Sequence, residues 1–442
     1  MDSNHDRAVP PSVLICDCKA IRLVHDSPSP AILTLACQFA TMDSGAFQPK
    51  SQHQVSRIRS FHPSRPLCGV NLLNLPLELI EYIIQSTAGG LALLQYRPVS
   101  RLFDNIILRY AFADYCPRTK NKFNALFSVC HRPRHLGGPA RVRRLAFPSE
   151  AEEMGIRSEE VIELLDLTTQ LKSMTTSWLF ELETLQTIPR AFAGLQHLCV
   201  YMRCSMRQVA WCMQLQRLRS LVITEVLREE EHGIVEWMQE HRATSSIVKM
   251  RIGLQGDTLS DGFRHLLLTP RSLEGLTVFA ASNVILQLVP SADELLHQHK
   301  PTLSALSFYC SNRRPWPPPM QTNVPTSWFT NFPVLRQLCL CTSHVGILQA
   351  AYSPDNPTNF LRTMVHSSLE LLLLKGLWPP EPYGPLYQSV LDLIQNHTIT
   401  SSLTLWTSPL HPNDLAGLLA ACTQHNIEPT FWHCNDQSSC IA

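Results

Sequence analysis

The residues of this chain with the clearest potential for chemistry are histidines and cysteines that gather in two places. They are Cys130, His131 and His135 in one place and His433, Cys434 and Cys440 in the other. Thiolate and imidazole groups are the usual ligands of zinc, but a structural zinc site takes four of them, commonly as two closely spaced pairs. Neither group has a second pair at that spacing, and loop residues of this type are usually solvated. We therefore expect no metal site.

Recognisable catalytic and cofactor-binding motifs are also missing from the sequence. There is no G-x-G-x-x-G, G-x-x-x-x-G-K-[ST], H-E-x-x-H, G-x-S-x-G or C-x-x-C. The 18 histidines could still form a triad with serine and aspartate in the folded chain, because sequence separation says nothing about it. We expect a protein that is not an enzyme, with no catalytic residue and no cofactor. An enzyme of unfamiliar type is kept as an alternative.

Charge and cysteine content narrow the classes of partner and the compartment. Lys and Arg total 37 against 36 Asp and Glu, so we expect neither a nucleic-acid partner nor a membrane partner. The 15 cysteines follow no disulfide framework, and several lie in apolar runs. We therefore expect reduced thiols and a cytoplasmic or nuclear protein. No uninterrupted apolar run of about 18 residues predicts a membrane span, and we expect no signal peptide.

The elements that would carry a function begin with three short helices, which the sequence predicts between residues 72 and 113. Pro76 suits a first helical position, and apolar residues then recur at helical spacing as far as Gly89-Gly90. Pro98 precedes a further apolar stripe of the same period. A unit of about forty residues rarely buries enough surface to be stable alone, so we expect it to dock on a partner.

The same residues resemble an F-box, whose pattern is L-P-x-E-L, a leucine pair and a V-(S/C)-R-x-(W/F) block. The sequence departs from the pattern at Pro98, where an aliphatic residue is usual, and at Phe103, where tryptophan is usual. The resemblance implies binding to the Skp-type adaptor of a cullin–RING ubiquitin ligase. The residues it assigns to adaptor binding are Leu75, Pro76, Leu79, Ile80, Ile83, Leu94, Val99 and Phe103. Periodicity does not show which of them face outward, and an ordinary three-helix linker is the alternative interpretation.

From residue 139 onward, an apolar frame of the form L-x-x-L-x-L recurs every 23 to 34 residues. The frames begin at Val142, Leu171, Leu195, Leu218, Ile247, Leu273, Leu303, Leu335, Leu369 and Thr400. Each frame predicts a strand whose fourth and sixth residues share one face. Helical patterns lie between the frames, and one of them contains a predicted capping box with Ser291 at the N-cap and Glu294 at N3.

This alternation resembles the leucine-rich-repeat family, which implies a solenoid with a parallel sheet. The Asn or Cys that the family places three positions after the frame is missing, with Arg203 and Val226 in two of these positions. Irregular turns are therefore expected, and a non-solenoid α/β fold stays open. The expected fold class is α/β, in four parts. They are a disordered tail over residues 1–71, a three-helix F-box over 72–113, a linker with a short helix around Phe123 over 114–138, and an irregular leucine-rich-repeat solenoid over 139–442.

Pro-rich insertions between the later frames predict where a partner would bind. Trp, Tyr and Arg dominate binding hot spots, so the candidate client-binding residues are Arg313, Arg314, Trp316, Trp378 and Tyr383. Solvated polyproline spacers are the alternative. We expect the substrate-recognition subunit of an SCF-type ligase, which binds a Skp-type adaptor, through it a cullin, and an unknown client protein. The alternative is a non-ligase scaffold with a degenerate F-box. The Pro-rich spacers and the loose repeat are similar to those of fungal F-box proteins.

Overall fold

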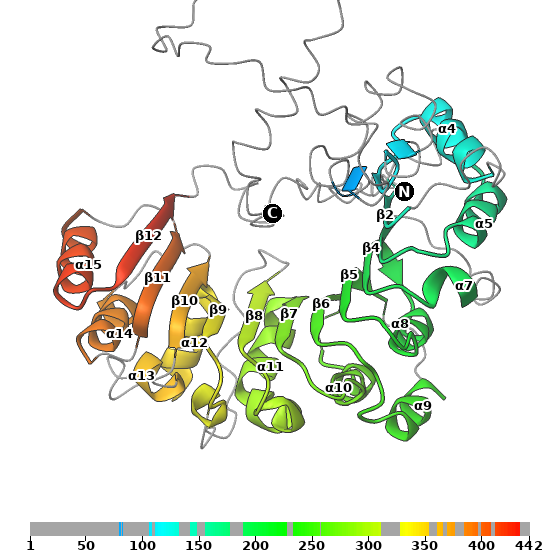
Figure 1. Cartoon of the computed structure of the whole chain (residues 1–442). Coiled ribbons are helices and arrows are strands. Elements are labelled where there is room, and N and C mark those ends of the chain that lie inside the picture. Colours follow the sequence, from blue (N-terminus) through cyan, green and yellow to red (C-terminus); the bar gives the residue numbers. More distant parts are fainter. Residues whose placement is uncertain are drawn as a thin grey trace, which may run out of the picture. The chain divides into compact units, whose positions relative to one another are not determined.

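The fold is described from a computed structural model of the chain, which divides into two compact units (Figure 1). One unit comprises residues 19–145 and the other residues 1–18 and 146–442. The described residues are 79–80, 82, 106–107, 111–131, 142–147, 155–176, 189–227, 233–256, 258–310, 328–352, 360–365, 369–375, 384–396, 399–407 and 412–433. The predicted tail, residues 1–71, lies outside them.

The unit of residues 19–145 contains a helix and a short parallel strand pair. Helix α4 (Lys120–Cys130) begins after Thr119, whose hydroxyl accepts a hydrogen bond from the Lys122 N–H at 3.3 Å. The helix buries Phe123 and Leu126, so the helix predicted in the linker is confirmed. Strand β1 (Asp114–Tyr115) pairs in parallel with β2 (Arg144–Ala146) through Asp114 and Arg144.

The larger unit is built on a parallel sheet whose strands lie side by side in the order of the sequence. The strands are β3 (Ser173–Thr176), β4 (His197–Cys204), β5 (Ser220–Val226), β6 (Lys249–Leu254), β7 (Gly275–Ala280), β8 (Ala305–Cys310), β9 (Gln337–Cys341), β10 (Leu369–Lys375), β11 (Ile399–Thr407) and β12 (Glu428–His433). The predicted α/β class and parallel sheet are confirmed. Strand β12 has no frame and was not predicted.

The sequence frames account for the register of this sheet. Most strands begin two residues after the start of a frame, so that the fourth frame residue pairs with its counterpart in the next strand, as in Leu198↔Leu221, Leu221↔Met250 and Leu276↔Leu306. The fourth and sixth frame residues of β8, Leu306 and Phe308, are both buried. A one-residue slip would turn this apolar row to the other side, so burial fixes the register.

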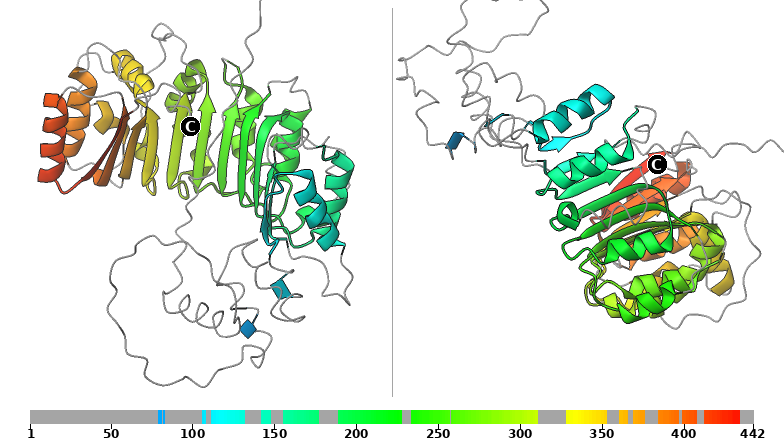
Figure 2. Two further views of the ribbon diagram at one scale, coloured as in Figure 1. Left: turned by 90° about the horizontal axis from the view of Figure 1, so that it is seen from above. Right: turned by 90° about the vertical axis from the view of Figure 1, so that its right-hand side faces the viewer.

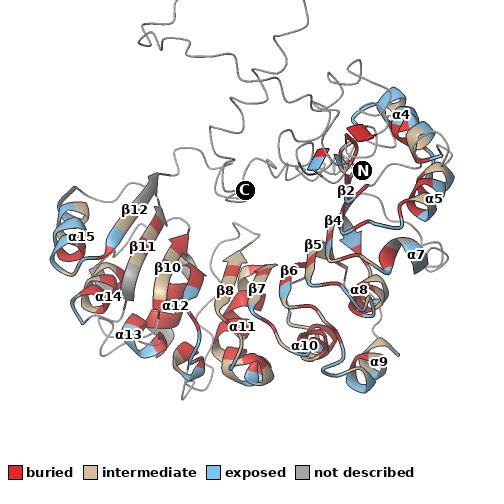
Figure 3. Cartoon of the chain, viewed as in Figure 1, coloured by how far each residue is buried: buried red, intermediate tan, exposed pale blue. Residues whose placement is uncertain are grey.

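The helices of the larger unit follow one another along one side of the sheet (Figure 1). They are α5 (Ser158–Leu167), α7 (Pro189–Phe192), α8 (Met206–Met213), α9 (Ile234–Glu240), α10 (Asp261–Leu268), α11 (Ser282–Leu295), α12 (Thr342–Tyr352), α13 (Phe360–Met364), α14 (Gly384–Gln395) and α15 (Pro412–Gln424), with the 3₁₀ turns η5 (His297–His299) and η6 (Phe329–Asn331). The views in Figure 2 show the same layering, and Figure 3 shows buried residues in strands and helices alike. The hydrophobic core therefore lies between one side of the sheet and the helices.

The predicted capping box at Ser291 is wrong. Helix α11 begins at Ser282 and continues through Pro290 to Leu295, so Ser291 lies inside it. A proline in a helix interior removes a backbone hydrogen bond. The sequence therefore predicts that a new helix begins after Pro290. Burial of Ile285, Leu288 and Val289 in this helix is the tertiary contribution that outweighs the local preference.

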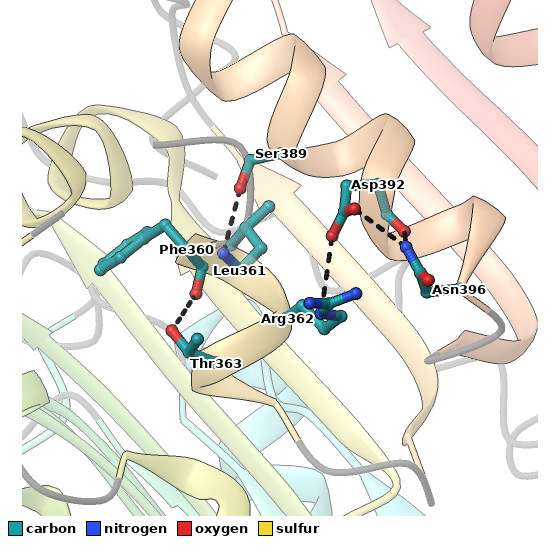
Figure 4. Close-up of polar contacts among 7 residues, drawn as sticks. All are labelled: Phe360, Leu361, Arg362, Thr363, Ser389, Asp392 and Asn396. Carbon is teal, nitrogen blue, oxygen red and sulfur yellow. Dashed lines mark hydrogen bonds and ion pairs between the residues drawn. The ribbon is translucent and has the colours of Figure 1, made fainter. Parts of the chain in front are cut away.

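Polar contacts between neighbouring helices join successive repeats. Ser389 of α14 is fully buried, and its hydroxyl accepts a hydrogen bond from the Leu361 N–H at 3.0 Å, at the start of α13 (Figure 4). On the same pair of helices, Arg362 lies 3.8 Å from Asp392. A buried hydroxyl without a partner is costly, so this bond fixes the position of α13 on α14.

Among the described residues, no helix combines the length and the apolar character that crossing a membrane requires.

Candidate functional site

The side of the sheet that no described helix covers is the candidate site of the larger unit (Figure 1). Successive side chains of a strand point to opposite faces, so the residues on either side of the buried fourth and sixth frame positions point away from the helices. These third, fifth and seventh frame residues of β3–β10 are called the strand face. Pairing aligns them across strands, as in Gly275↔Ala305 and Phe279↔Tyr309.

A hollow of about 410 Å³ lies at the centre of the strand face, over β5 to β9. Its floor contains Gly275 and Ala305, which occupy the third frame position of two adjacent strands. The small side chains leave the backbone accessible there, whereas Lys249 and Gln337 stand at the same position in the flanking strands β6 and β9. The hollow is therefore a direct consequence of two small residues at one frame position.

Positive charge predominates around this central hollow. Lys249, Arg251 and Arg336 line it, with Glu274 as the single acidic lining residue. The Arg336 guanidinium is 3.2 Å from the Glu370 carboxylate, an exposed pair of the kind that stabilises little. Lys249 has no ion pair within 4.0 Å among the described residues, and its side chain is exposed. The hollow is therefore suited to a negatively charged group.

A row of stacked cations and rings crosses the strand face beside the hollow. The Arg251 guanidinium lies 4.6 Å from the centre of the Phe279 ring, and the Phe279 and Tyr309 rings stack with centroids 4.8 Å apart. The Lys375 ammonium lies 5.2 Å from the centre of the Tyr309 ring. Cation–π and ring contacts hold all four side chains in place, so this aromatic row is a preformed surface.

The Tyr309 hydroxyl of the aromatic row and the neighbouring Cys339 thiol remain protonated at neutral pH. Burial raises the pKa of the Tyr309 hydroxyl well above its usual range, and burial likewise raises the pKa of the neighbouring Cys339 thiol to about 12. The thiolate, not the thiol, is the nucleophile of cysteine chemistry. Cys339 is therefore suited to packing and hydrogen bonding rather than to nucleophilic catalysis.

Gly253 of β6 lies where the pairing between β5 and β6 is irregular. The register between these strands shifts between Ile223 and Val226, which marks a bulge in β5. A side chain at Gly253 would overlap the carbonyl oxygen of Thr224 in this bulge. Gly253 thus allows β6 to approach the bulged strand closely.

The described residues of the predicted F-box are 79–80, 82, 106–107 and 111–113, and Leu79, Ile80 and Tyr82 among them are helical. Leu79 is 49% exposed and Tyr82 is 67% exposed, whereas Ile80 is 1% exposed. Positions three apart lie on one side of a helix. Leu79 and Tyr82 thus present one apolar face outward, while Ile80 belongs to the core. The other candidates, Leu75, Pro76, Ile83, Leu94, Val99 and Phe103, lie outside the described residues.

The candidate client-binding residues Arg313, Arg314, Trp316, Trp378 and Tyr383 also lie outside the described residues. Sequence reasoning missed the strand face instead. The signal was present, because the residues between the apolar frame positions must point away from the core. Which of them become neighbours depends on the register across strands, and a single frame does not contain that information.

The described residues form no group of three or more His, Cys, Asp or Glu side chains that could hold a metal ion. Cys130 and His131 of the first cysteine–histidine group are described, and burial raises the pKa of the Cys130 thiol to about 12. His135, Cys434 and Cys440 lie outside the described residues.

Comparison with known proteins gives no further assignment: no family model matches the chain, and no curated protein matches it. The functional argument therefore depends on the sequence patterns and on the geometry of the strand face.

Proposed function

We propose that this chain is the substrate-recognition subunit of an SCF-type cullin–RING ubiquitin ligase. Its F-box-like segment binds a Skp-type adaptor, and the strand face of an irregular leucine-rich-repeat solenoid binds the client protein. The chain supplies no catalytic residue. Its contribution is positional, because tethering raises the effective concentration of a client lysine near the conjugating enzyme.

The observation that carries this proposal is the pairing of an adaptor-type motif with a sheet that keeps one side accessible. Parallel strands in sequence order, most of them followed by a helix on the same side, are typical of a solenoid in which each repeat packs only against its neighbours. Such an array presents a long surface for protein binding. In the F-box-like segment, exposed Leu79 next to buried Ile80 supports an outward apolar contact.

The second candidate is an interaction scaffold with the same strand face and a degenerate F-box that recruits no ligase. The departures at Pro98 and Phe103 favour this alternative. Adaptor binding by the wild-type chain without ubiquitination of a bound client would support the scaffold.

The adaptor contact is tested by co-purification of the full chain with a recombinant Skp-type adaptor. We expect the wild-type chain to retain the adaptor and Leu79→Glu to reduce the retained amount at least tenfold. A matched control is Leu419→Glu on α15, since Leu419 is also an exposed leucine, at 40%. Failure of the wild-type chain to bind the adaptor, or equal losses in both variants, would overturn the ligase proposal.

A further inference from the structure

We propose that the central hollow binds an acidic side chain of an extended client segment, and that the adjacent aromatic row binds an apolar side chain of the same segment. This inference rests on the proposed function, because it names the chemistry of the client.

The charge of the hollow selects an acidic group. Three exposed cationic residues line it against one carboxylate. Lys249 makes no ion pair within 4.0 Å among the described residues, whereas Arg336 is paired with Glu370 and Arg251 lies on the Phe279 ring. Once Glu370 is counted with Glu274, three cations face two carboxylates, so that one positive charge remains. The single charge of an Asp or Glu side chain balances it, whereas a phosphate group carries up to two charges.

The shape of the hollow admits that side chain together with its backbone. Neighbouring strands lie about 4.8 Å apart, so β6 and β9 flank the floor of Gly275 and Ala305 at a separation of roughly 14 Å. Thr277 also lines the hollow and supplies a hydroxyl group. A carboxylate can therefore meet the ammonium and a neutral donor together without first displacing a large side chain.

The strand geometry sets the spacing of the client segment. The hollow is centred on the third frame position of β7 and β8, whereas Phe279 and Tyr309 stand at the seventh, four residues further along. Four residues of an extended strand span about 13 Å, and an extended client segment along the strands advances by the same amount. The segment is therefore expected to carry an acidic residue and an aromatic or aliphatic residue four positions apart.

The test begins with selection of a displayed library of random twelve-residue peptides on the immobilised full chain. The expected outcome is enrichment of Asp or Glu four positions from an aromatic or aliphatic residue. No enrichment, or enriched peptides without an acidic residue, would overturn the inference. The affinity of an enriched peptide for the full chain is then measured by fluorescence anisotropy.

Two variants separate the charge from the shape of the hollow. Lys249→Glu reverses the charge, and Gly275→Val fills the floor, where an added Cβ meets only Lys249 Cγ at 3.8 Å and so fits the fold. Each is expected to weaken binding of the enriched peptide at least tenfold, whereas Lys172→Glu, an exposed lysine beside β3, leaves it unchanged. Thermal unfolding shows that the variants fold.

Three results would contradict the assignment. They are binding insensitive to both hollow variants, equal loss in the Lys172→Glu control, and tighter binding when phosphoserine replaces the acidic residue. Adaptor co-purification with the same variants distinguishes this inference from the proposed function. Lys249→Glu is expected to retain the adaptor. If the variants bind the peptide as the wild-type chain does while the wild-type chain binds the adaptor, the assignment of the hollow fails and the ligase proposal stands. If the wild-type chain fails to bind the adaptor, the ligase proposal fails.

Discussion

Gly253 lies against the bulge of β5, where the structure leaves no room for a side chain. A Cβ there would overlap the Thr224 carbonyl oxygen, and a backbone atom cannot turn away as a side chain can. We expect Gly253→Ala to lower the free energy of unfolding by roughly 1–3 kcal/mol, as overpacking against rigid atoms does. Urea denaturation measures the change. Gly275→Ala is the control, because its Cβ meets an ordinary contact, and similar losses in both variants would contradict the explanation.

His344 makes stability depend on pH. The imidazole is buried, its Nε2 lies 3.1 Å from the Ser282 hydroxyl, and its Nδ1 has no hydrogen-bond partner among the described residues. Burial lowers the pKa of His344 from 6.5 to about 4. Between pH 6.5 and about 4, His344 is therefore protonated in the unfolded chain and neutral in the folded chain. Stability is fully present above pH 6.5 and falls as pH decreases towards 4.

The measurement compares the wild-type chain with His344→Gln by urea denaturation between pH 7 and pH 4. At about 1.36 kcal/mol for each pH unit, the wild-type chain is expected to lose up to roughly 3 kcal/mol more than the variant over this range. His297→Gln, at an exposed histidine of η5, should follow the wild-type curve. Parallel curves for the wild-type chain and His344→Gln would show that the imidazole is not buried in neutral form.

The candidate site shows at the residue scale what could be predicted and what could not. The buried partners Leu276 and Leu306 follow from the frames, because an apolar residue at the fourth position is the basis of the pattern. The contact of Arg251 with Phe279 was not predictable in the same way. These residues are 28 positions apart in the chain, at the fifth and seventh frame positions, and they meet only through the register of β6 and β7.

At the scale of elements, the last helix and strand of the larger unit extend the sheet without closing it. Strand β12 pairs with β11, and α15 packs on β12 and α14. Stability of such an array is close to a sum over neighbouring repeats. We expect a chain that ends at Thr407 to keep β3 to β11 folded with a lower melting temperature. Circular dichroism and limited proteolysis measure this, and complete loss of structure would show that the unit folds only as a whole.

Strands were easier to predict than helices, for a physical reason. Each strand that has a frame places its fourth and sixth frame residues in the core, and these apolar frames recur with little variation. Helix α10 has an N-cap at Ser260, whose hydroxyl accepts a hydrogen bond from the Phe263 N–H at 3.2 Å, and only the general expectation of a helix between two frames anticipated it. In α12, buried polar residues such as Thr342 and His344 obscure the apolar stripe that marks an amphipathic helix.

At the scale of the whole molecule, the two proposed contacts belong to different compact units. Leu79 lies in the unit of residues 19–145 and Lys249 in the unit of residues 1–18 and 146–442. Residues that share no partner affect binding independently. Leu79→Glu should therefore lose the adaptor and keep the enriched acidic peptide, and Lys249→Glu should do the reverse. Pull-down of both ligands by each variant tests this, and loss of both ligands in either variant would contradict it.

A ubiquitination assay with a reporter that carries the enriched peptide and accessible lysines tests the positional role. Both variants are expected to reduce modification of the reporter at low concentration, because in the proposed function the chain acts only by holding the reporter near the ligase. Saturating reporter restores occupancy of a weakened peptide site by mass action. It should therefore rescue Lys249→Glu and leave Leu79→Glu inactive, since no amount of reporter recruits the adaptor. Rescue of neither variant would imply that the strand face does more than tether the client.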